Sequence, residues 1–534
     1  MPGGPNIMRP LMEHALVKTN VAAEYPDYLR DESRKSGVAE SISFPTTEAD
    51  VVSIVAEARG DGVAVTTQGA RTGITGGAVP DGGHILNLSR MNRVLGIRHE
   101  AADDSFRVSV QPGILLSDLR GLLRRKEFDT AGWSKDSLAA LAQFQHAGSF
   151  FLAPDPTETS ASIGGMAACN ASGACSFRYG PMRRYVTAVR VALVDGSLLA
   201  LRRGRERAAG RSFRFTTEDG RGLEGRLPSY RLPDVKNASG LYAADDMDLV
   251  DLFVGAEGTL GVFTSIELAL LPEPACRWGV TAFFPSEATA VAFVKALRGQ
   301  APAVQPAAIE FFDARALGLL RLQKASNAAF AGIPGMPESW HTAVYVEYHG
   351  AEDPVAEAVA AMSGLMLAAG GSEDATWIAT NAAELERLKF FRHAVPEAVN
   401  LLIDERRRQE PGLTKLGTDM AVPDRCLDEA LRMYHAGLDE TGLDHVMFGH
   451  IGNNHLHVNI LPHTLHDYAV GKDLYLRWAR RTIALGGTVS AEHGIGKFKV
   501  ALLREMYGDA GIHEMRDVKR VFDPAGLLNR GNLF

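Results

Sequence analysis

Hydrophobic and polar residues repeat along this chain with the periods of helices and strands, and their order predicts mixed α and β structure. Residues 46–62, TTEADVVSIVAEARGDG, place apolar side chains at helical spacing and end at a glycine, so we expect a helix there. VAVTT follows as a buried strand, and residues 105–113, SFRVSVQPG, alternate as a half-buried strand does. ILLSDLRGLLRRK then has the pattern of a short amphipathic helix.

The second half of the chain alternates between strand and helix patterns. Pro-Glu-Pro at 272–274 predicts a domain boundary, and the unit GVTAFFPS, EATAVAFVKALRG and IEFFD follows it. HTAVYVEYHG and the helical residues 351–371 form another such unit. This alternation predicts an α+β sheet covered by helices on one face. A chain of 534 residues is too long for one core, so we expect two or three domains.

Two segments do not fit the pattern. Residues 128–150 lack clear turn signals and are predicted to be an insertion, and residues 201–236 are polar and irregular. The second segment contains a basic cluster, RRGRERAAGRSFR, at residues 202–214. A solvated loop or hairpin is the favoured interpretation of the cluster, and a docking patch for an acidic protein or a membrane surface is the alternative.

Composition narrows the class of protein. A net charge of -8 argues against nucleic acid as the main partner. The four cysteines form no CxxC pair, which speaks against an iron–sulfur cluster or zinc ribbon and favours a reducing compartment. The first residues lack the layout of a secretory signal, and no uncharged apolar run reaches the length of a membrane span. We therefore expect a cytoplasmic protein.

Three segments rich in Gly, Ser and Thr lie in the first half, at residues 68–80, 155–173 and 254–263. The first, QGARTGITGGAVP, follows a predicted strand but matches neither GxGxxG nor the GK[ST] of a P-loop, and alone it fits a plain turn equally well. Glycines let the backbone approach a ligand closely, and successive amides can bind an anion. Three such segments together suit a large anionic dinucleotide held by main-chain donors.

A histidine-rich stretch, GHIGNNHLHVN at residues 449–459, holds three of the 16 histidines. If Asn453-Asn454 forms a two-residue hairpin loop, His450 lies opposite His457, and Asn459 shares the face of His457. Glu492 lies in a second polar stretch, SAEHGIGKFK. Two histidines and a carboxylate with open positions suit zinc, and manganese would also suit the oxygen ligand. The alternative is a stacked, hydrogen-bonded pair of histidines on a half-buried sheet.

Several ordered motifs in this chain resemble FAD-dependent enzymes of the vanillyl-alcohol-oxidase type. They are GARTGITGGAVP, VQPG, SIGGMAACNASG followed by RYG, EGTLGVFTSIELALLP, EFFD, TDMAVP, GHIGNNHLHVN, SAEHGIGKFK and FDPAGLLN. Together they resemble FAD-linked D-2-hydroxyacid dehydrogenases, notably the D-lactate (cytochrome-type) and glycolate oxidase branch. The resemblance implies a PCMH-type FAD-binding domain of two α/β subdomains, a ferredoxin-like α+β substrate domain and a C-terminal helical cap. On this basis we expect an N-terminal arm at 1–40, the FAD-binding domain at 41–273 and the substrate and metal domain at 274–534.

The resemblance also implies how FAD is held. The first segment would wrap the pyrophosphate, the second would line the flavin, and the third would serve the adenine side. The implied residues are Gly69, Arg71, Thr72, Gly73, Thr75, Gly76, Gly77, Pro112, Ser162, Gly164, Gly165, Asn170, Gly173, Glu257, Gly258, Gly261 and Val262. Some relatives attach flavin through a histidine in the first loop, and no histidine lies between Gln68 and Pro80 here, so we expect noncovalent FAD.

The catalytic residues follow from the same comparison and from the chemistry of alcohol oxidation. The resemblance points to His450, His457 and Glu492 as metal ligands. His493 is the candidate general base, because a neutral imidazole can accept a proton near neutral pH. Asn459 could hydrogen-bond the substrate.

The substrate carboxylate needs a cation. Arg392 resembles the substrate arginine of the family and can clamp a carboxylate through two hydrogen bonds. The alternative is an arginine on a helix surface, paired with Glu386 or Glu397.

These features predict a metal-assisted, FAD-dependent dehydrogenase that converts a D-2-hydroxy acid to the 2-oxo acid. In the 2-hydroxyglutarate branch a lysine stands two residues before the Asp of the TDMAVP-like motif; here that residue is Gly417, and Lys415 is displaced. A monocarboxylate such as lactate or glycolate is therefore favoured. The alternatives are D-2-hydroxyglutarate dehydrogenase, a flavin transferase like alkyl-dihydroxyacetone-phosphate synthase, and a metallohydrolase without flavin.

The partners expected for such an enzyme are a small 2-hydroxy acid and an electron acceptor. With no cluster ligands in the chain, the electrons would leave to oxygen, a quinone, a cytochrome, an electron-transfer flavoprotein or a separate iron–sulfur subunit. Peripheral contact with the inner membrane and a homodimer stay open.

Overall fold

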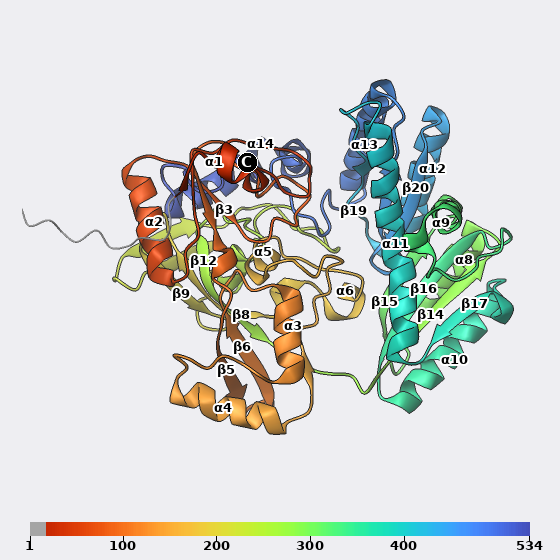
Figure 1. The fold of residues 1–534 in the computed structure, drawn as a ribbon, viewed down its shortest axis with the longest axis horizontal. Coiled ribbons are helices and arrows are strands. Elements are labelled where there is room, and N and C mark those ends of the chain that lie inside the picture. Colours follow the sequence, from red (N-terminus) through yellow and green to blue (C-terminus); the bar gives the residue numbers. More distant parts are fainter. Residues whose placement is uncertain (1–17) are drawn as a thin grey trace, which may run out of the picture.

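The computed structural model describes residues 18–534, which fold into two domains with a small sheet at the N-terminal end of the first (Figure 1). This small sheet has the strand order β1-β2-β4-β3. Its elements are β1 (Lys18–Thr19), β2 (Ser41–Ser43), helix α2 (Glu48–Gly60), β3 (Val65–Gln68) and β4 (His84–Asn87). The predicted helix at 46–62 is thus confirmed as α2. Thr47 and Asp50 form its capping box, and Val51 and Val55 pack against Val65 of β3.

The second subdomain is a five-stranded antiparallel sheet in the order β5-β6-β12-β8-β9. Its strands are β5 (Val94–Glu100), β6 (Ser105–Val110), β8 (Val186–Ala192), β9 (Leu198–Arg202) and β12 (Val262–Ala269). Its helices include α3 (Leu116–Arg125), α4 (Lys135–His146), α5 (Ile163–Ala168) and α6 (Ser176–Tyr179), with the short α1 (Val21–Glu24) and α7 (Val250–Phe253) elsewhere in the domain. The two subdomains agree with the PCMH-type architecture.

The two segments without a clear pattern are more regular than their sequences indicate. Residues 128–150 contain α4, whose Phe144 is fully buried, and the indole of Trp133 donates to Val94 O at 3.0 Å. Residues 201–236 contain a hairpin of β10 (Ser212–Thr216) and β11 (Gly222–Arg226). Because the exposed faces of these elements are polar, the hydrophobic pattern of the sequence does not reveal them.

The hairpin interpretation of the basic cluster gains support from its ion pairs. Four of the six arginines at residues 202–214 pair with carboxylates in the same domain. The pairs are Arg202–Glu267, Arg203–Asp251, Arg211–Asp245 and Arg214–Glu224. These contacts neutralise most of the cluster, which weakens the case for a docking patch.

The second domain is built on an eight-stranded sheet in the order β17-β14-β16-β15-β20-β21-β18, and β19 also pairs with β21. The strands are β14 (Cys276–Phe284), β15 (Pro306–Phe312), β16 (Thr342–Gly350), β17 (Thr376–Ala379), β18 (Leu416–Gly417), β19 (Met420–Ala421), β20 (His445–His450) and β21 (His455–Ile460). A small ribbon pairs β7 (Phe150–Phe151) with β13 (Leu271–Pro272). The order β17-β14-β16-β15 is that of a ferredoxin-like unit, as the resemblance implies.

Helices cover both faces of this sheet at its centre, so the prediction of one covered face is wrong. The helices are α8 (Glu287–Arg298), α9 (Ala314–Ser326), α10 (Glu352–Ala368), α11 (Ala382–Arg407), α12 (Leu427–Thr441) and α13 (Leu465–Ala484). Val280 and Phe284 of β14 belong to the same cluster as α8 and α10, whereas Phe283 packs with Phe391 of α11. Because β14 is apolar on both sides, the period-2 signal that distinguishes a covered face is lost.

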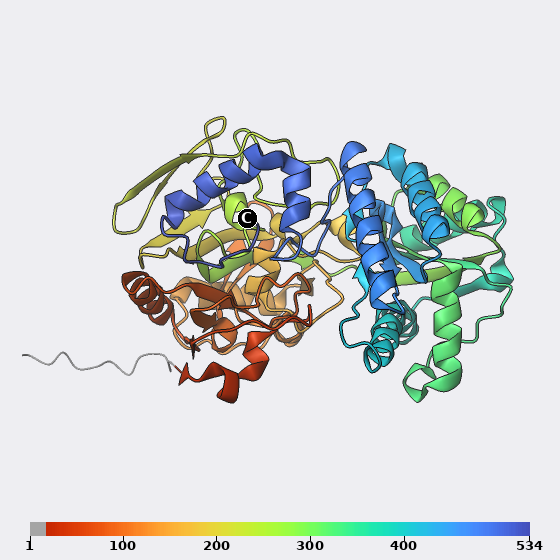
Figure 2. The same cartoon turned by 90° about the horizontal axis from the view of Figure 1, so that it is seen from above.

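The last segment of the chain returns to the first domain (Figure 2). Helix α14 (Val500–Phe522) places Phe522 against Phe213, with ring centroids 5.9 Å apart, and Val65 N donates to Leu527 O at 2.9 Å. The helical cap implied by the resemblance is therefore divided between α12 and α13 on the second domain and α14 on the first. No helix within residues 18–534 has the length and apolar character needed to cross a bilayer.

Candidate functional site

The histidine-rich stretch forms the β20–β21 hairpin, but in a different register from the predicted one. His450 lies opposite His455, and Phe448 lies opposite His457. The turn comprises residues 451–454, with only Asn454 at positive φ (51°). The predicted two-residue loop and the direct His450–His457 pairing are therefore wrong. Ile451 is fully buried, and a side chain at Gly452 would lie 2.9 Å from the ring of Phe177, so packing holds the turn in its longer form.

The side chains converge all the same. In the observed register His450 and His457 are diagonal neighbours across the strand pair, close enough for long side chains to meet. Their ring centroids are 5.4 Å apart, and the His455 ring lies 5.3 Å from His450 and 4.4 Å from His457. The hairpin thus presents three imidazoles together.

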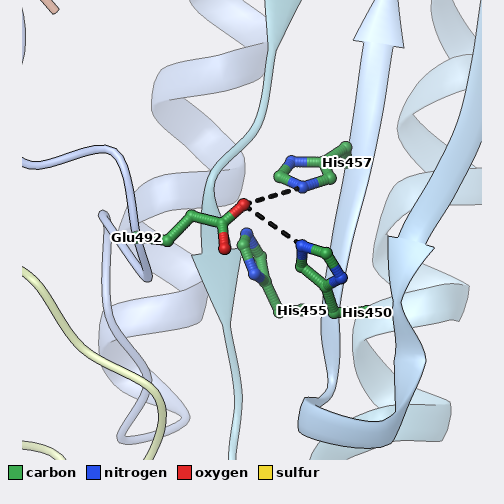
Figure 3. A group of neighbouring side chains, drawn as sticks. All are labelled: His450, His455, His457 and Glu492. Atoms are coloured by element: carbon green, nitrogen blue, oxygen red, sulfur yellow. Dashed lines mark hydrogen bonds and ion pairs between the residues drawn. The ribbon is translucent and has the colours of Figure 1, made fainter. Parts of the chain in front are cut away.

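Glu492 reaches this group from the loop of the SAEHGIGKFK motif (Figure 3). Its Oε1 lies 3.2 Å from His450 Nε2 and 3.4 Å from His457 Nε2. Metal–ligand bonds of about 2.1 Å put neighbouring ligand atoms roughly 3.0 to 3.4 Å apart in octahedral or tetrahedral geometry. The two distances from Glu492 Oε1 therefore fall within the range found between ligand atoms of one divalent ion.

The outer nitrogens of the two predicted histidine ligands are also bonded. His450 Nδ1 lies 2.7 Å from Glu310 Oε1, and His457 Nδ1 donates to Thr418 O at 3.0 Å. Metal-binding histidines usually donate their second N–H to such a carboxylate or carbonyl. Burial opposes a charge on His450, but the charge of Glu310 prevails and raises the pKa of His450 to about 9.

The second oxygen of Glu492 is held by the first domain. Lys236 Nζ donates to Oε2 at 2.5 Å, and Ser172 Oγ donates to it at 3.3 Å. Burial would raise the pKa of Glu492, but the charges of Lys236 and His450 hold it well below the ordinary value. The site is therefore assembled from both domains. Sequence reasoning missed Lys236, which lies at the end of a segment without a clear pattern.

His493 is oriented by Asp419, a residue of the TDMAVP motif that the sequence analysis did not assign. Asp419 Oδ2 lies 3.3 Å from His493 Nδ1 and accepts from Lys499 Nζ and Ser490 Oγ, both at 2.6 Å. His493 Nε2 lies 3.5 Å from Glu492 Oε1. With 28% of its side chain exposed, His493 is more open than the buried histidines of the hairpin. A carboxylate behind an accessible imidazole is the arrangement of an oriented general base.

Arg392 lies on α11 with its guanidinium turned inward. Its nearest charged groups include Glu310, and its Nη1 is buried without a hydrogen-bond partner among residues 18–534. Glu386 pairs with Lys389, so the surface pairing considered for Arg392 does not form with that residue. A buried, unpartnered guanidinium N–H fits the binding of a substrate carboxylate.

Asn459 lies on β21 two residues beyond His457. It is buried, and its Nδ2 donates to His457 O at 3.3 Å. Its role toward substrate stays a prediction.

The three glycine-rich segments come together in the first domain. Gly69 approaches Ser162 so closely that a side chain would collide with it, Ala70 N donates to Ser162 Oγ at 3.3 Å, and Gly164 N donates to Pro112 O at 2.7 Å. Within the described chain, the amides of residues 71–77 donate to no protein group. A run of free amides beside glycines fits the pyrophosphate of a dinucleotide.

The first and third segments also contact the loop that carries His493. Thr75 O accepts from Lys497 N at 3.0 Å, and the carboxylate of Glu257 accepts from Ile495 N and Gly496 N at 2.7 and 2.8 Å. Burial raises the pKa of Glu257 to about 7 despite these amides. The carboxylate of Glu257 thus stabilises the loop that carries His493.

Other residues of the predicted FAD set divide between loops and sheet. Asn170 adopts a positive φ of 51° within the second segment, whereas Gly261 packs against Val191 and Val262 pairs with Ala192 in the sheet. Roles for Gly261 and Val262 in FAD binding stay predictions.

Comparison with known proteins identifies two domains. Residues 274–533 match the family described as FAD linked oxidases, C-terminal domain, and residues 39–131 and 137–202 match the FAD binding domain. Among curated proteins, the chain is 29% identical to a probable mitochondrial D-lactate dehydrogenase of Danio rerio over 94% of this chain and 86% of that protein. It is 28% identical to a D-2-hydroxyglutarate dehydrogenase of Xanthomonas citri (92% and 89% covered) and 25% identical to glycolate oxidase subunit GlcD of Bacillus subtilis (88% and 84%).

Solved structures share the fold. A 4-ethylphenol oxidase from Gulosibacter chungangensis aligns with a TM-score of 0.63 at 17% identity, covering 97% of this chain and 94% of that one. An alkyldihydroxyacetonephosphate synthase aligns with a TM-score of 0.61 at 14% identity, covering 96% and 81%. At such identities the likeness shows the fold alone.

Proposed function

The chain belongs to the FAD-linked oxidases, and from that premise we propose that it oxidises a D-2-hydroxy acid to the 2-oxo acid with noncovalent FAD and a divalent metal ion. The observation that carries the proposal is the distance of 3.2 Å from Glu492 Oε1 to His450 Nε2 and of 3.4 Å to His457 Nε2, which supports metal binding. This group is joined to the glycine-rich segments because Thr75 Oγ1 donates to His493 O at 3.4 Å. Metal ligands beside a predicted flavin-binding loop suit the removal of a hydride from the α-carbon and of a proton from its hydroxyl group.

Different residues of the chain have separate roles in this oxidation. When bound, FAD would supply the hydride acceptor for the α-carbon, and His450, His457 and Glu492 would hold a metal ion that would supply Lewis acidity to the hydroxyl. His493 takes the hydroxyl proton, and Asp419 orients its ring and stabilises the imidazolium. Arg392 Nη1 binds the substrate carboxylate.

The surroundings of Gly417 support a monocarboxylate substrate such as lactate or glycolate. A side chain at Gly417 would begin 2.7 Å from Asn459 Oδ1, so this position offers no cation for a second carboxylate. Lys415 Nζ instead donates to Asn400 Oδ1 at 2.9 Å, and burial lowers the pKa of Lys415 to about 8. Because Lys415 is a cation two residues from Gly417, D-2-hydroxyglutarate is the second candidate substrate.

The electrons then pass to a separate acceptor. Oxygen, a quinone, a cytochrome, an electron-transfer flavoprotein and an iron–sulfur subunit stay alternatives for this step. All four cysteines are free, which supports the proposal of a cytoplasmic protein.

Anaerobic flavin reduction tests the proposal. The purified protein is mixed with D- and L-lactate, glycolate and D-2-hydroxyglutarate, flavin bleaching is recorded, and bound metal is measured in the same sample. We expect D-lactate or glycolate to bleach the flavin fastest and one equivalent of metal per chain. Flavin that stays oxidised with every acid would contradict the proposal and favour the transferase alternative. A colourless protein that retains metal would favour the metallohydrolase.

A further inference from the structure

A third imidazole, that of His455, belongs to the same group of ligand atoms. His455 is fully buried, and both of its ring nitrogens lack a hydrogen-bond partner in the part of the chain that the structure describes. An unsatisfied buried polar group destabilises the fold, so such a group calls for a partner. The missing partner points to a ligand.

The position of His455 shows which ligand it would meet. One of its ring nitrogens, one nitrogen each of His450 and His457 and one oxygen of Glu492 all lie within 4.8 Å of one another. Figure 3 shows the His455 ring beside the Glu492 carboxylate, on the same side of the hairpin as the other two imidazoles. The four donor atoms thus lie close enough together to share one ion.

The Asp419 carboxylate is also close to the His455 ring. Asp419 Oδ1 lies 3.0 Å from His455 Nε2 but without the alignment of a hydrogen bond. The carboxylate therefore does not satisfy the ring.

A histidine of the same hairpin shows what a purely structural role looks like. His445 is buried on β20, and its Nδ1 bonds to Leu443 O at 3.0 Å. His455 has no such bond. His445 therefore has a hydrogen-bonded ring nitrogen and His455 has none, which makes His445 a matched control.

We propose that His455 is a third imidazole ligand, so that the metal ion takes three histidines and one carboxylate from the protein. The inference rests on the metal site of the proposed function. The four residues would hold the ion, which would supply Lewis acidity to the hydroxyl of the 2-hydroxy acid. An imidazole-rich set also favours zinc or iron over manganese.

Zinc K-edge X-ray absorption of the full-length, FAD-loaded protein tests the inference, because imidazole rings give a countable scattering pattern. The protein is treated with a chelator and reloaded with one equivalent of zinc. We expect three imidazoles in the wild type, two in His455→Asn and three in His445→Asn. A competition titration should show zinc bound at least about tenfold more weakly by His455→Asn.

Two imidazoles in the wild type, or an unchanged count in His455→Asn, would overturn the inference. The wild-type count decides the matter even if His455→Asn fails to fold, which the flavin spectrum and thermal melting would reveal. If the wild-type protein binds no zinc, both this inference and the metal site of the proposed function are contradicted. If the wild type shows two imidazoles and its flavin is still reduced by a hydroxy acid, His455 is excluded as a ligand and the proposed function stands.

Discussion

Replacing Glu310 tests whether the carboxylate that contacts His450 strengthens the binding of a metal ion. Glu310 is buried on β15, and its Oε1 lies 2.7 Å from His450 Nδ1. In Glu310→Gln the amide oxygen can still accept this hydrogen bond, but the negative charge is lost. Removing such a partner typically weakens metal binding about 10- to 100-fold, or about 1.4 to 2.7 kcal/mol.

Proton competition makes this effect depend on pH. In the wild type the pKa of His450 is about 9, so at pH 7.5 the metal must displace a proton, which lowers its apparent affinity about 30-fold. The substitution lowers that pKa and relieves the competition, so the two effects oppose each other near neutrality. At pH 9 little competition remains, and the loss of the charge dominates. The ratio of zinc dissociation constants, variant to wild type, should therefore rise with pH.

A zinc titration against a chromophoric chelator, run on FAD-loaded protein from pH 7 to 9, measures the ratio. Glu267→Gln is the matched control, because Glu267 is also buried but pairs with Arg98 and Arg202, outside both groups of residues that could hold a metal ion. An unchanged dissociation constant for Glu310→Gln at pH 9, or an equal loss in Glu267→Gln, would refute the reasoning.

Three further predictions concern substrate, cofactor and stability. Arg392→Met should raise KM for the hydroxy acid about 10- to 150-fold with little change in flavin content, since a charged hydrogen bond contributes about 1.5 to 3 kcal/mol; an unchanged KM would exclude Arg392 from the site. Gly496→Ala should lose flavin, because Gly496 has φ +52° and its new methyl would collide with a carbonyl of the first glycine-rich segment; Gly442→Ala, at φ +64° in open space, should keep it. Burial lowers the pKa of His84 to about 4. Between pH 6.5 and 4 the unfolded chain therefore binds more protons, and the free energy of unfolding should fall by about 3 kcal/mol as pH falls. Denaturant titrations should show a flatter pH profile in His84→Asn but not in the exposed control His466→Asn.

The site depends on contacts between the two domains. Lys236 and Ser172 of the first domain hold one oxygen of Glu492, which leaves the other facing the imidazoles of the second domain. Loop contacts such as Thr75 with His493 reinforce the junction. Glu492, the proposed metal ligand, has this orientation only when both domains are docked.

The sequence by itself determined the features that depend on near neighbours. The helical spacing and terminal glycine of residues 46–62 and the alternation of β6 predict those elements correctly, because both signals act over a few residues. The residue types of the site were also visible, since the chemistry of imidazole and carboxylate does not depend on the fold. His450, His457 and Glu492 could therefore be singled out before any geometry was known.

Only the tertiary structure decided the hairpin register, the inclusion of His455 and the partner of Glu492. The register follows from the burial of Ile451 and the close approach of Gly452 to Phe177, contacts with segments distant in sequence. Lys236 meets Glu492 across 256 residues. Local patterns carry no information about such pairs, because long-range packing, and not the preference of either segment, brings them together.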